Sequence, residues 1–266
     1  IVKKSIYSFT LSELRDYLSE RGFAKFAADQ IYQWLYKNLE QNPEQWTNVS
    51  KKIKDDFNEN LDLTLPKIIW NGLSKDGTRK FLVQMNDKES VEAVAIPARD
   101  RLTLCVSSQV GCAIGCKFCH TGTMGLKRNL TAGEIVGQFM AITHWLKENV
   151  GPEERLSNIV YMGQGEPLHN FDHVKKATEI FLETFGIELG PRNITLSTAG
   201  FLPGLKRFDE FPRINVALSL HSAIDEKRNK LIPLNQKYPL SEILETLEKL
   251  PRLKRQYIMC EYLLIK

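Results

Sequence analysis

Apolar residues recur three or four positions apart along the first part of the chain, which is the spacing of one face of a helix. Thr10 followed by Glu13 is typical of a helix start, because each side chain can hydrogen-bond to the backbone of the other residue. We expect helices at residues 11–22 and 24–38, and a third that begins near Ser50. The apolar positions of the first two helices are Leu11, Leu14, Leu18, Phe26, Ile31, Trp34 and Leu35.

Between residues 66 and 107 the pattern changes to alternating apolar and polar positions, which is the period of a strand. Asp76-Gly77 lies between two such runs and is a strong hairpin-turn signal. A second turn is expected at residues 86–88. This part of the chain therefore predicts a short antiparallel β extension.

From residue 131 onward, apolar strand-like runs alternate with helix-like segments. Thr131 and Glu134 form a second capping-box pattern, and another helix is expected over residues 171–186. The strand-like runs are residues 158–163, 192–198, 214–221 and 257–265. This alternation predicts a parallel sheet, doubly wound or barrel-like, whose site lies at the carboxyl ends of the strands.

Composition narrows these possibilities only slightly. The chain has 266 residues, of which 42% are hydrophobic and 26% charged, and a formal charge of +4. No apolar run reaches the roughly 20 residues of a membrane span, and the start does not resemble a signal peptide, so we expect a cytoplasmic protein without membrane association. The mild positive charge allows a nucleic-acid partner without requiring one.

Three of the five cysteines, Cys112, Cys116 and Cys119, lie within eight positions. Their spacing differs from zinc knuckles and from the ferredoxin run, and thiolate sites normally close with four ligands. Three thiolates on a four-iron cluster leave one iron free to bind a small molecule, and Phe118 would shield such a cluster from water. The alternative is a zinc site completed by Cys105 or His120.

The cysteine segment CAIGCKFC, followed by GEP, resembles the radical S-adenosylmethionine (radical SAM) superfamily. TLCVSSQVGCAIGCKFC, MGQGEPLHN, TLSTAG and ALSLHSAIDEKRNKLIPLNQKYPL, in this order after a helical segment, resemble the RlmN/Cfr family within it. The resemblance implies a partial (β/α)6 TIM-type barrel whose last part is missing. It divides the chain into an N-terminal helical, RNA-docking accessory domain (1–65), a β-hairpin extension (66–100) and the radical SAM core (101–266).

The resemblance implies a role for each matching residue. Cys112, Cys116 and Cys119 would ligate a 4Fe–4S cluster whose remaining iron binds the amino and carboxylate groups of S-adenosylmethionine. Glu92 would accept a proton, and Cys105 would help to resolve the RNA adduct. The positions that match cofactor contacts are Gly165, Glu166, Ser197, Ser219, Leu220 and His221. The first two of these match the contact to the methionine amino group.

The implied activity is methylation of carbon 2 of an adenosine in 23S rRNA and in some transfer RNAs. Two S-adenosylmethionine molecules would be used per turnover, one to methylate a protein cysteine and one to give a 5′-deoxyadenosyl radical. The RNA adduct would be released with a transient protein disulfide. The family also implies a flavodoxin-type electron donor, and we expect a monomer.

The resemblance implies that the methyl-carrying cysteine lies in a C-terminal segment beyond Lys266. Cys260 alternates within an apolar strand and is expected to be a buried, inert thiol. We therefore expect the chain to be a fragment that assembles a cluster but does not methylate RNA alone. Such a fragment would expose an unpaired strand edge.

Two alternatives remain open at this point. One is the sister activity at carbon 8 of the adenosine, which gives antibiotic resistance; Pro167 favours carbon 2, since that subgroup tends to have alanine there. The other is a non-catalytic iron–sulfur or zinc protein that binds RNA.

Overall fold

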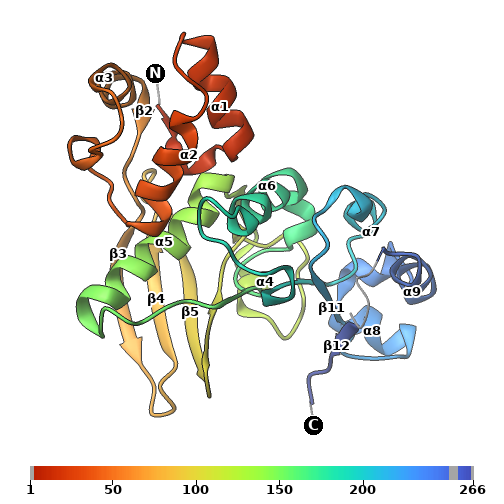
Figure 1. Ribbon diagram of the computed structural model, residues 1–266. Coiled ribbons are helices and arrows are strands. Elements are labelled where there is room, and N and C mark those ends of the chain that lie inside the picture. The colour runs from red at the N-terminus through yellow and green to blue at the C-terminus, as the bar shows by residue number, and fades with distance from the viewer. Residues whose placement is uncertain (1–2, 252–256, 265–266) are drawn as a thin grey trace.

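The computed structural model describes residues 3–251 and 257–264 and confirms a mixed α/β fold (Figure 1). Its main sheet has eight strands in the order β12-β11-β10-β9-β6-β5-β4-β3. These strands are β3 (Lys67–Leu73), β4 (Arg79–Gln84), β5 (Ser90–Ala98), β6 (Arg101–Cys105), β9 (Asn158–Tyr161), β10 (Ile194–Thr198), β11 (Asn215–Ser219) and β12 (Ile258–Glu261). Within the described residues the sheet does not close into a barrel, because β3 and β12 are its two edges.

The sheet joins a parallel and an antiparallel part. Strands β6, β9, β10, β11 and β12 are parallel, as the strand–helix alternation predicts. Strands β3 to β6 are antiparallel, with the predicted turn at Gly77 between β3 and β4. The β extension therefore continues the sheet of the core without a break.

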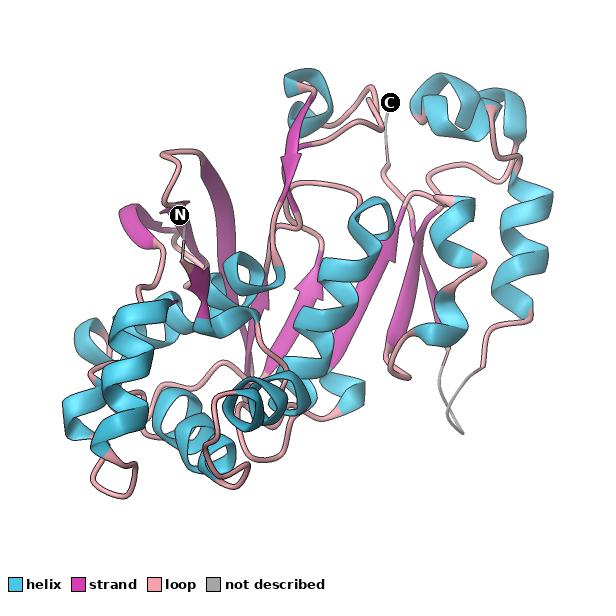
Figure 2. Ribbon diagram, turned by 90° about the horizontal axis from the view of Figure 1, so that it is seen from above, coloured by secondary structure: helices cyan, strands magenta, loops and turns pink. Residues whose placement is uncertain are grey.

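Helices lie along one face of the curved row of strands (Figure 2). They are α5 (Ala132–Asn149), α6 (Phe171–Leu182), α7 (Leu202–Leu205) and α9 (Leu240–Glu248), whereas α8 (Asp225–Leu231) lies at the carboxyl ends of β10 and β11, where Arg228 bonds to the carbonyls of Ala199 and Ser219. The strand residues that face them, such as Phe81 and Leu196, are completely buried. On the opposite, inner face, Ile96 and Met259 are 40% and 44% exposed. Parts of that face are therefore open to solvent.

A small antiparallel pair frames the cysteine loop. It consists of β7 (Gln109–Gly111) and β8 (Leu126–Asn129), with the short helix α4 (His120–Met124) between them. Gly111 has a φ of +76°, and a β-carbon there would lie 1.8 Å from the carbonyl oxygen of Gly125. Only glycine allows the two ends of the loop to approach this closely.

The first part of the chain forms the predicted three-helix module. Its elements are α1 (Leu11–Glu20), α2 (Ala27–Tyr32) and α3 (Lys51–Asn60), with a short parallel pair of β1 (Lys4–Ser5) and β2 (Leu61–Asp62). Thr10 and Glu13 make the expected capping box. The second helix differs from the prediction, because it continues from Gln33 to Lys37 as a π-helical turn. Phe26 is 65% exposed and precedes the helix, so its place in the apolar stripe was wrong.

The module packs against α5 at two glycines one turn apart. The Gly133 N–H donates to Ser8 Oγ at 3.1 Å, and a β-carbon on Gly137 would lie 2.7 Å from Pro66 Cδ. Ser8 and Pro66 lie near the beginning and the end of the module. Both of its ends are therefore held on the same stretch of one core helix.

Two further predictions were wrong. The helix expected over residues 171–186 ends at Leu182, because Glu183 already has an extended backbone. Cys260 is exposed rather than buried: its register with the buried Leu218 puts it on the helix-facing side of the sheet, but β12 is the edge strand. Among the helices of the described residues, none has the length and apolar character needed to cross a lipid bilayer.

Candidate active site

A cavity of about 270 Å³ lies at the carboxyl ends of the parallel strands. It contains most of the residues that the sequence indicates, on segments far apart in the chain. Those residues are Cys112, Cys116, Cys119, Gly165, Glu166, Ser197, Ser219 and His221. Strand ends of a parallel sheet meet at one edge, which is why segments so distant in sequence share one cavity.

The cysteine loop is held by backbone hydrogen bonds and sits on apolar side chains. The Cys112 N–H donates to the Gly125 carbonyl at 3.0 Å, and the Lys117 N–H donates to the Leu231 carbonyl at 2.9 Å. Cys112 and Cys116 pack against a small buried cluster of Ile114, Ala199 and Ile232. The loop is thus fixed at both ends while its thiols face the cavity.

Burial determines the protonation of two of these thiols. It raises the pKa of Cys112 to about 11 and that of Cys116 to about 12, and negative charge on neighbouring groups adds to both increases. Both groups are therefore neutral thiols unless a cationic centre displaces their protons, as metal binding does.

The three thiols suit an iron–sulfur cluster. Within residues 3–251 and 257–264, no three His, Cys, Asp or Glu side chains meet around one ion position. In a four-iron cluster each thiolate binds a different iron, and the ligands need not converge on one point. An apolar wall and displaceable thiol protons suit such a group.

Gly165 brings the end of β9 against the segment before the cysteines. Its φ is +102°, and a β-carbon there would lie 2.6 Å from Gln109 Cβ. Gln109 Oε1 accepts the Glu166 N–H at 2.9 Å, and its Nε2 donates to Asn129 Oδ1 at 2.7 Å. The glycine therefore sets the position of the glutamate that follows it.

Glu166 is a buried carboxylate, 3% exposed, with no cationic partner at hydrogen-bond distance among the described residues. Its Oε1 accepts the Leu168 N–H at 3.1 Å, and its Oε2 accepts the Ala199 N–H at 2.8 Å. Burial raises its pKa to about 7, against the opposing effect of these hydrogen bonds. An ammonium group in the cavity would stabilise the charged form.

Two hydroxyls and a second carboxylate continue the polar lining. Ser197 Oγ and Ser219 Oγ are 3.2 Å apart, and Ser219 Oγ donates to Glu261 Oε2 at 3.2 Å. The other oxygen, Glu261 Oε1, is buried and has no hydrogen-bond partner in the described part of the chain. The sequence did not indicate Glu261, although a charged residue within an apolar strand was the available signal.

The segment after β11 contributes the imidazole ring of His221 to the cavity lining. His221 has a left-handed backbone, with a φ of +54°, and its ring contacts the Phe118 ring edge-on at a centroid distance of 4.7 Å. Burial lowers the pKa of His221. Leu220 differs from the other indicated residues, because its side chain packs on the main core and does not line the cavity.

Glu92 and Cys105 also lie outside the cavity lining. The carboxylate of Glu92 pairs with Lys80 Nζ at 2.5 Å, and Cys105 is buried at the end of β6. Burial raises the pKa of Cys105 to about 11. Cys105 is paired with Val94, two residues from Glu92, so both side chains belong to the open inner face of the sheet.

Comparison with known proteins agrees with this geometry. Residues 106–264 match the family model of the radical SAM superfamily, and residues 5–63 match the ribosomal RNA large subunit methyltransferase N-terminal domain. The chain is 43% identical to a probable dual-specificity RNA methyltransferase RlmN of Dictyoglomus turgidum, over 98% of this chain and 74% of that protein. A protein with the same name from Akkermansia muciniphila is also 43% identical, over 97% and 72%.

The chain belongs to the RlmN family of radical SAM RNA methyltransferases. A crystal structure of a radical SAM methyltransferase from Sphaerobacter thermophilus shares the fold, with a TM-score of 0.83 and 38% identity over 91% of this chain and 71% of that one. Radical SAM proteins in general bind a 4Fe–4S cluster and S-adenosylmethionine.

All five cysteines of this RlmN-family chain are free thiols in the structure. The fold therefore holds none of them in a permanent disulfide. The transient disulfide that the resemblance implies stays a prediction about a reaction intermediate.

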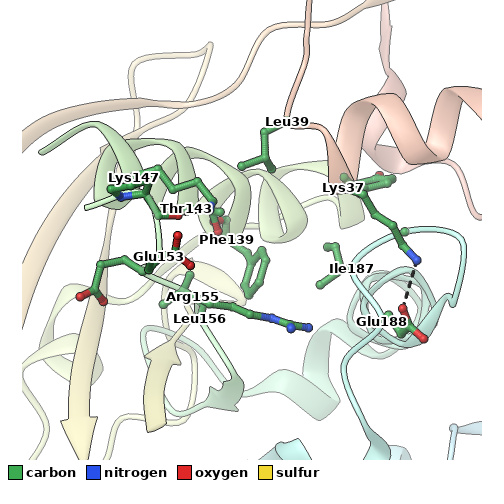
Figure 3. A pocket seen from close by; sticks show the side chains of 14 residues that line it. Lys37, Leu39, Phe139, Thr143, Lys147, Glu153, Arg155, Leu156, Ile187 and Glu188 are labelled. Carbon is green, nitrogen blue, oxygen red and sulfur yellow. Dashed lines mark hydrogen bonds and ion pairs between the residues drawn. The ribbon is translucent and has the colours of Figure 1, made fainter. Parts of the chain in front are cut away.

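A second cavity, of about 390 Å³, lies between the helical module and the core (Figure 3). Lys37 of the module pairs there with Glu188 at 3.0 Å, and Phe139 and Leu156 form part of its apolar wall. None of the residues that match RlmN-family sites lines it. Its greater volume does not make it the chemical centre of the molecule.

Proposed function

We propose that the chain carries the machinery that methylates carbon 2 of adenosine in 23S rRNA and in transfer RNA. The observation that carries this proposal is the meeting of the three thiols, the buried Glu166 and the Ser197–Ser219 hydroxyl pair in one cavity. The names of the relatives, which are dual-specificity RNA methyltransferases, support RNA as the substrate.

In this proposal Cys112, Cys116 and Cys119 hold a 4Fe–4S cluster. When bound, the cluster supplies the electron that cleaves S-adenosylmethionine. Glu166 binds the methionine ammonium group, because its buried carboxylate has unused lone pairs and, among the described residues, no cation at hydrogen-bond distance.

The hydroxyls of Ser197 and Ser219 and the backbone around Leu220 orient the rest of the cofactor. Phe118 and His221, in edge-on contact, keep water from this side of the cavity. Exclusion of water strengthens the polar contacts inside the site.

Glu92 and Cys105 act on the RNA from the open inner face of the sheet. Glu92 accepts the proton of the adduct, with Lys80 holding its carboxylate in place. Because its pKa is raised, Cys105 stays a neutral thiol until it reacts with the RNA adduct. We further propose two cofactor molecules per turnover, a flavodoxin-type donor, a monomeric state and a cytoplasmic location.

Anaerobic reconstitution tests the proposal. The chain is expected to bind about four irons and, after reduction, to convert S-adenosylmethionine to 5′-deoxyadenosine. Tetrahedral zinc without that product would instead support a non-catalytic RNA-binding protein. If unmodified 23S rRNA or transfer RNA is methylated, mass spectrometry is expected to identify 2-methyladenosine, and 8-methyladenosine would contradict the proposal.

A further inference from the structure

Arg228 in α8 is completely buried, with 0% of its surface exposed, and it was not among the residues that the sequence indicates. Its guanidinium donates hydrogen bonds on three sides. Nε donates to the Leu220 carbonyl at 3.1 Å, and Nη2 donates to the carbonyls of Ser219 at 3.0 Å and Ala199 at 2.8 Å. Nη1 donates to Asn235 Oδ1. All four acceptors are uncharged oxygens.

Two of these acceptors, Ser219 and Ala199, line the thiol cavity. Ser219 ends β11 and Leu220 follows it, whereas Ala199 follows β10. The Ala199 N–H donates to Glu166 Oε2 at 2.8 Å, so Ala199 is bonded to Glu166 on one side and to Arg228 on the other. Arg228 therefore fixes the end of β11 at Ser219. It also fixes Ala199, whose N–H holds the Glu166 carboxylate.

A buried cation with only neutral hydrogen-bond partners is costly unless negative charge lies nearby. One such charge is Asp225, which reaches Arg228 through Asn235: Asn235 Nδ2 donates to Asp225 Oδ1 at 2.7 Å. The other would be the anionic cluster of the proposed function on the cysteine loop, which packs on Ala199, whose carbonyl accepts from the guanidinium.

We propose that Arg228 is a positioning residue of the cofactor site, which aligns the ends of β10 and β11 for S-adenosylmethionine and stabilises the reduced cluster with its fixed charge. The inference rests on the proposed function, because it assumes the cluster on the cysteine loop. Reduction adds an electron to an already anionic group, and a buried cation behind that group favours the added charge. The planar guanidinium can bond to carbonyls of two strands at once, which an ammonium group cannot do in the same geometry.

The test compares Arg228→Met and Arg228→Lys with the wild-type chain after anaerobic reconstitution. The dissociation constant for S-adenosylmethionine is measured by equilibrium dialysis, and the cluster potential by redox titration followed by electron paramagnetic resonance. Arg228→Met is expected to raise the dissociation constant at least about tenfold and to make the potential more negative. Arg228→Lys is expected to restore the potential but not the affinity.

Arg213→Met is the matched control, because Arg213 is exposed and precedes β11 at the end of the strand opposite the cavity. It removes the same charge and is expected to change neither value. Wild-type potential and affinity in Arg228→Met would overturn the inference, and so would equal potentials in the Met and Lys variants. If Arg228→Met does not fold, wild-type affinity in Arg228→Lys overturns the positioning role.

The wild-type chain separates this inference from the proposed function. Failure of the wild type to bind iron and to cleave S-adenosylmethionine would overturn both. Normal cleavage by the wild type, together with unchanged affinity and potential in the Arg228 variants, would overturn only the role of Arg228.

Discussion

The thiol cavity and the cavity beneath the helical module hold their charged groups in opposite ways. In the thiol cavity, Glu166 is almost fully buried and bonded to two backbone N–H groups, with no cation in contact among the described residues. In the second cavity, Lys37 and Glu188 pair with each other, and their side chains are 43% and 55% exposed. The first cavity is the smaller of the two.

This difference indicates which charged groups are available to bind a ligand. In an exposed ion pair each charge already has a partner and is hydrated, so a ligand adds little stabilisation. A buried carboxylate without a counterion has unused hydrogen-bond capacity, and its desolvation is unfavourable. A ligand with a positive group offsets that cost, and for this reason we assign the chemistry to the smaller cavity.

The largest expected effect comes from removing one thiol of the triplet. Cys116→Ser is expected to abolish cluster assembly and to reduce formation of 5′-deoxyadenosine below detection, because a serine oxygen is a poor ligand for iron–sulfur clusters. Iron content and product formation are measured after anaerobic reconstitution. Cys260→Ser, at an exposed thiol of β12, is the control and is expected to behave as the wild type. Full activity in Cys116→Ser would remove the basis for the assignment.

The second prediction concerns the stability of the cluster-free chain. Burial raises the pKa of Glu166 from its ordinary value of 4.5 to about 7, so the folded state binds a proton that the unfolded state has already lost between these values. Stability must therefore fall as the pH rises from about 4.5 to 7, by up to about 3 kcal/mol from this group. Urea unfolding at several pH values measures the loss.

Glu166→Gln is the matched variant for that measurement, since it keeps the shape of the side chain and cannot titrate. It is expected to lose this component of the pH dependence. The same slope in both proteins would show that Glu166 is not the group responsible.

The third prediction tests the close approach at the end of β9. Gly165→Ala is expected to destabilise the chain by about 1–3 kcal/mol and to weaken S-adenosylmethionine binding, because the alanine combines an unfavourable positive φ with a clash against Gln109. Gly151→Ala is the control, because a β-carbon at Gly151 would meet no atom within 4 Å and the backbone there has no positive φ. Thermal unfolding and equilibrium dialysis of both variants provide the comparison.

The smallest effect is expected in the second cavity. Lys37→Met removes the ion pair with Glu188 and is expected to change the free energy of unfolding by no more than about 1 kcal/mol. Its affinity for S-adenosylmethionine is expected to equal that of the wild type. A clear loss of affinity would mean that the two cavities are coupled.

The parts of the fold that depend on local pattern were predictable from the sequence. Capping boxes at Thr10 and Thr131 mark helix starts in both the sequence and the structure, and the Asp76-Gly77 turn joins two strands as expected. The polar ends of the parallel strands share one cavity, because strand order follows from strand–helix alternation. These features need only interactions between residues close in sequence, or a general rule of sheet topology.

Features that depend on the assembled sheet were not predictable. Whether Cys260 is buried depends on which strand forms the edge, and the sequence pattern of an edge strand resembles that of an inner one. In the sequence, Arg228 is one of several charged residues of α8 and gives no sign of burial. Only the folded chain brings it to the carbonyls of Ala199 and Ser219. The first glycine after α6 is Gly186, which lies against Tyr32 and Tyr36 of the module, whereas α6 already ends at Leu182.

The contact of Gly133 and Gly137 with Ser8 and Pro66 has a mechanical consequence. The two ends of the helical module, at Ser8 and Pro66, therefore contact α5 within one helical turn of each other. A force applied to the module by a large bound partner would therefore act on α5 at these two contacts. Gln138, one residue beyond Gly137, bonds through its amide to both the N–H and the carbonyl of Ser107, directly ahead of the cysteine loop. A load on the outermost helices therefore has a continuous covalent and hydrogen-bonded route to the segment that carries the thiols.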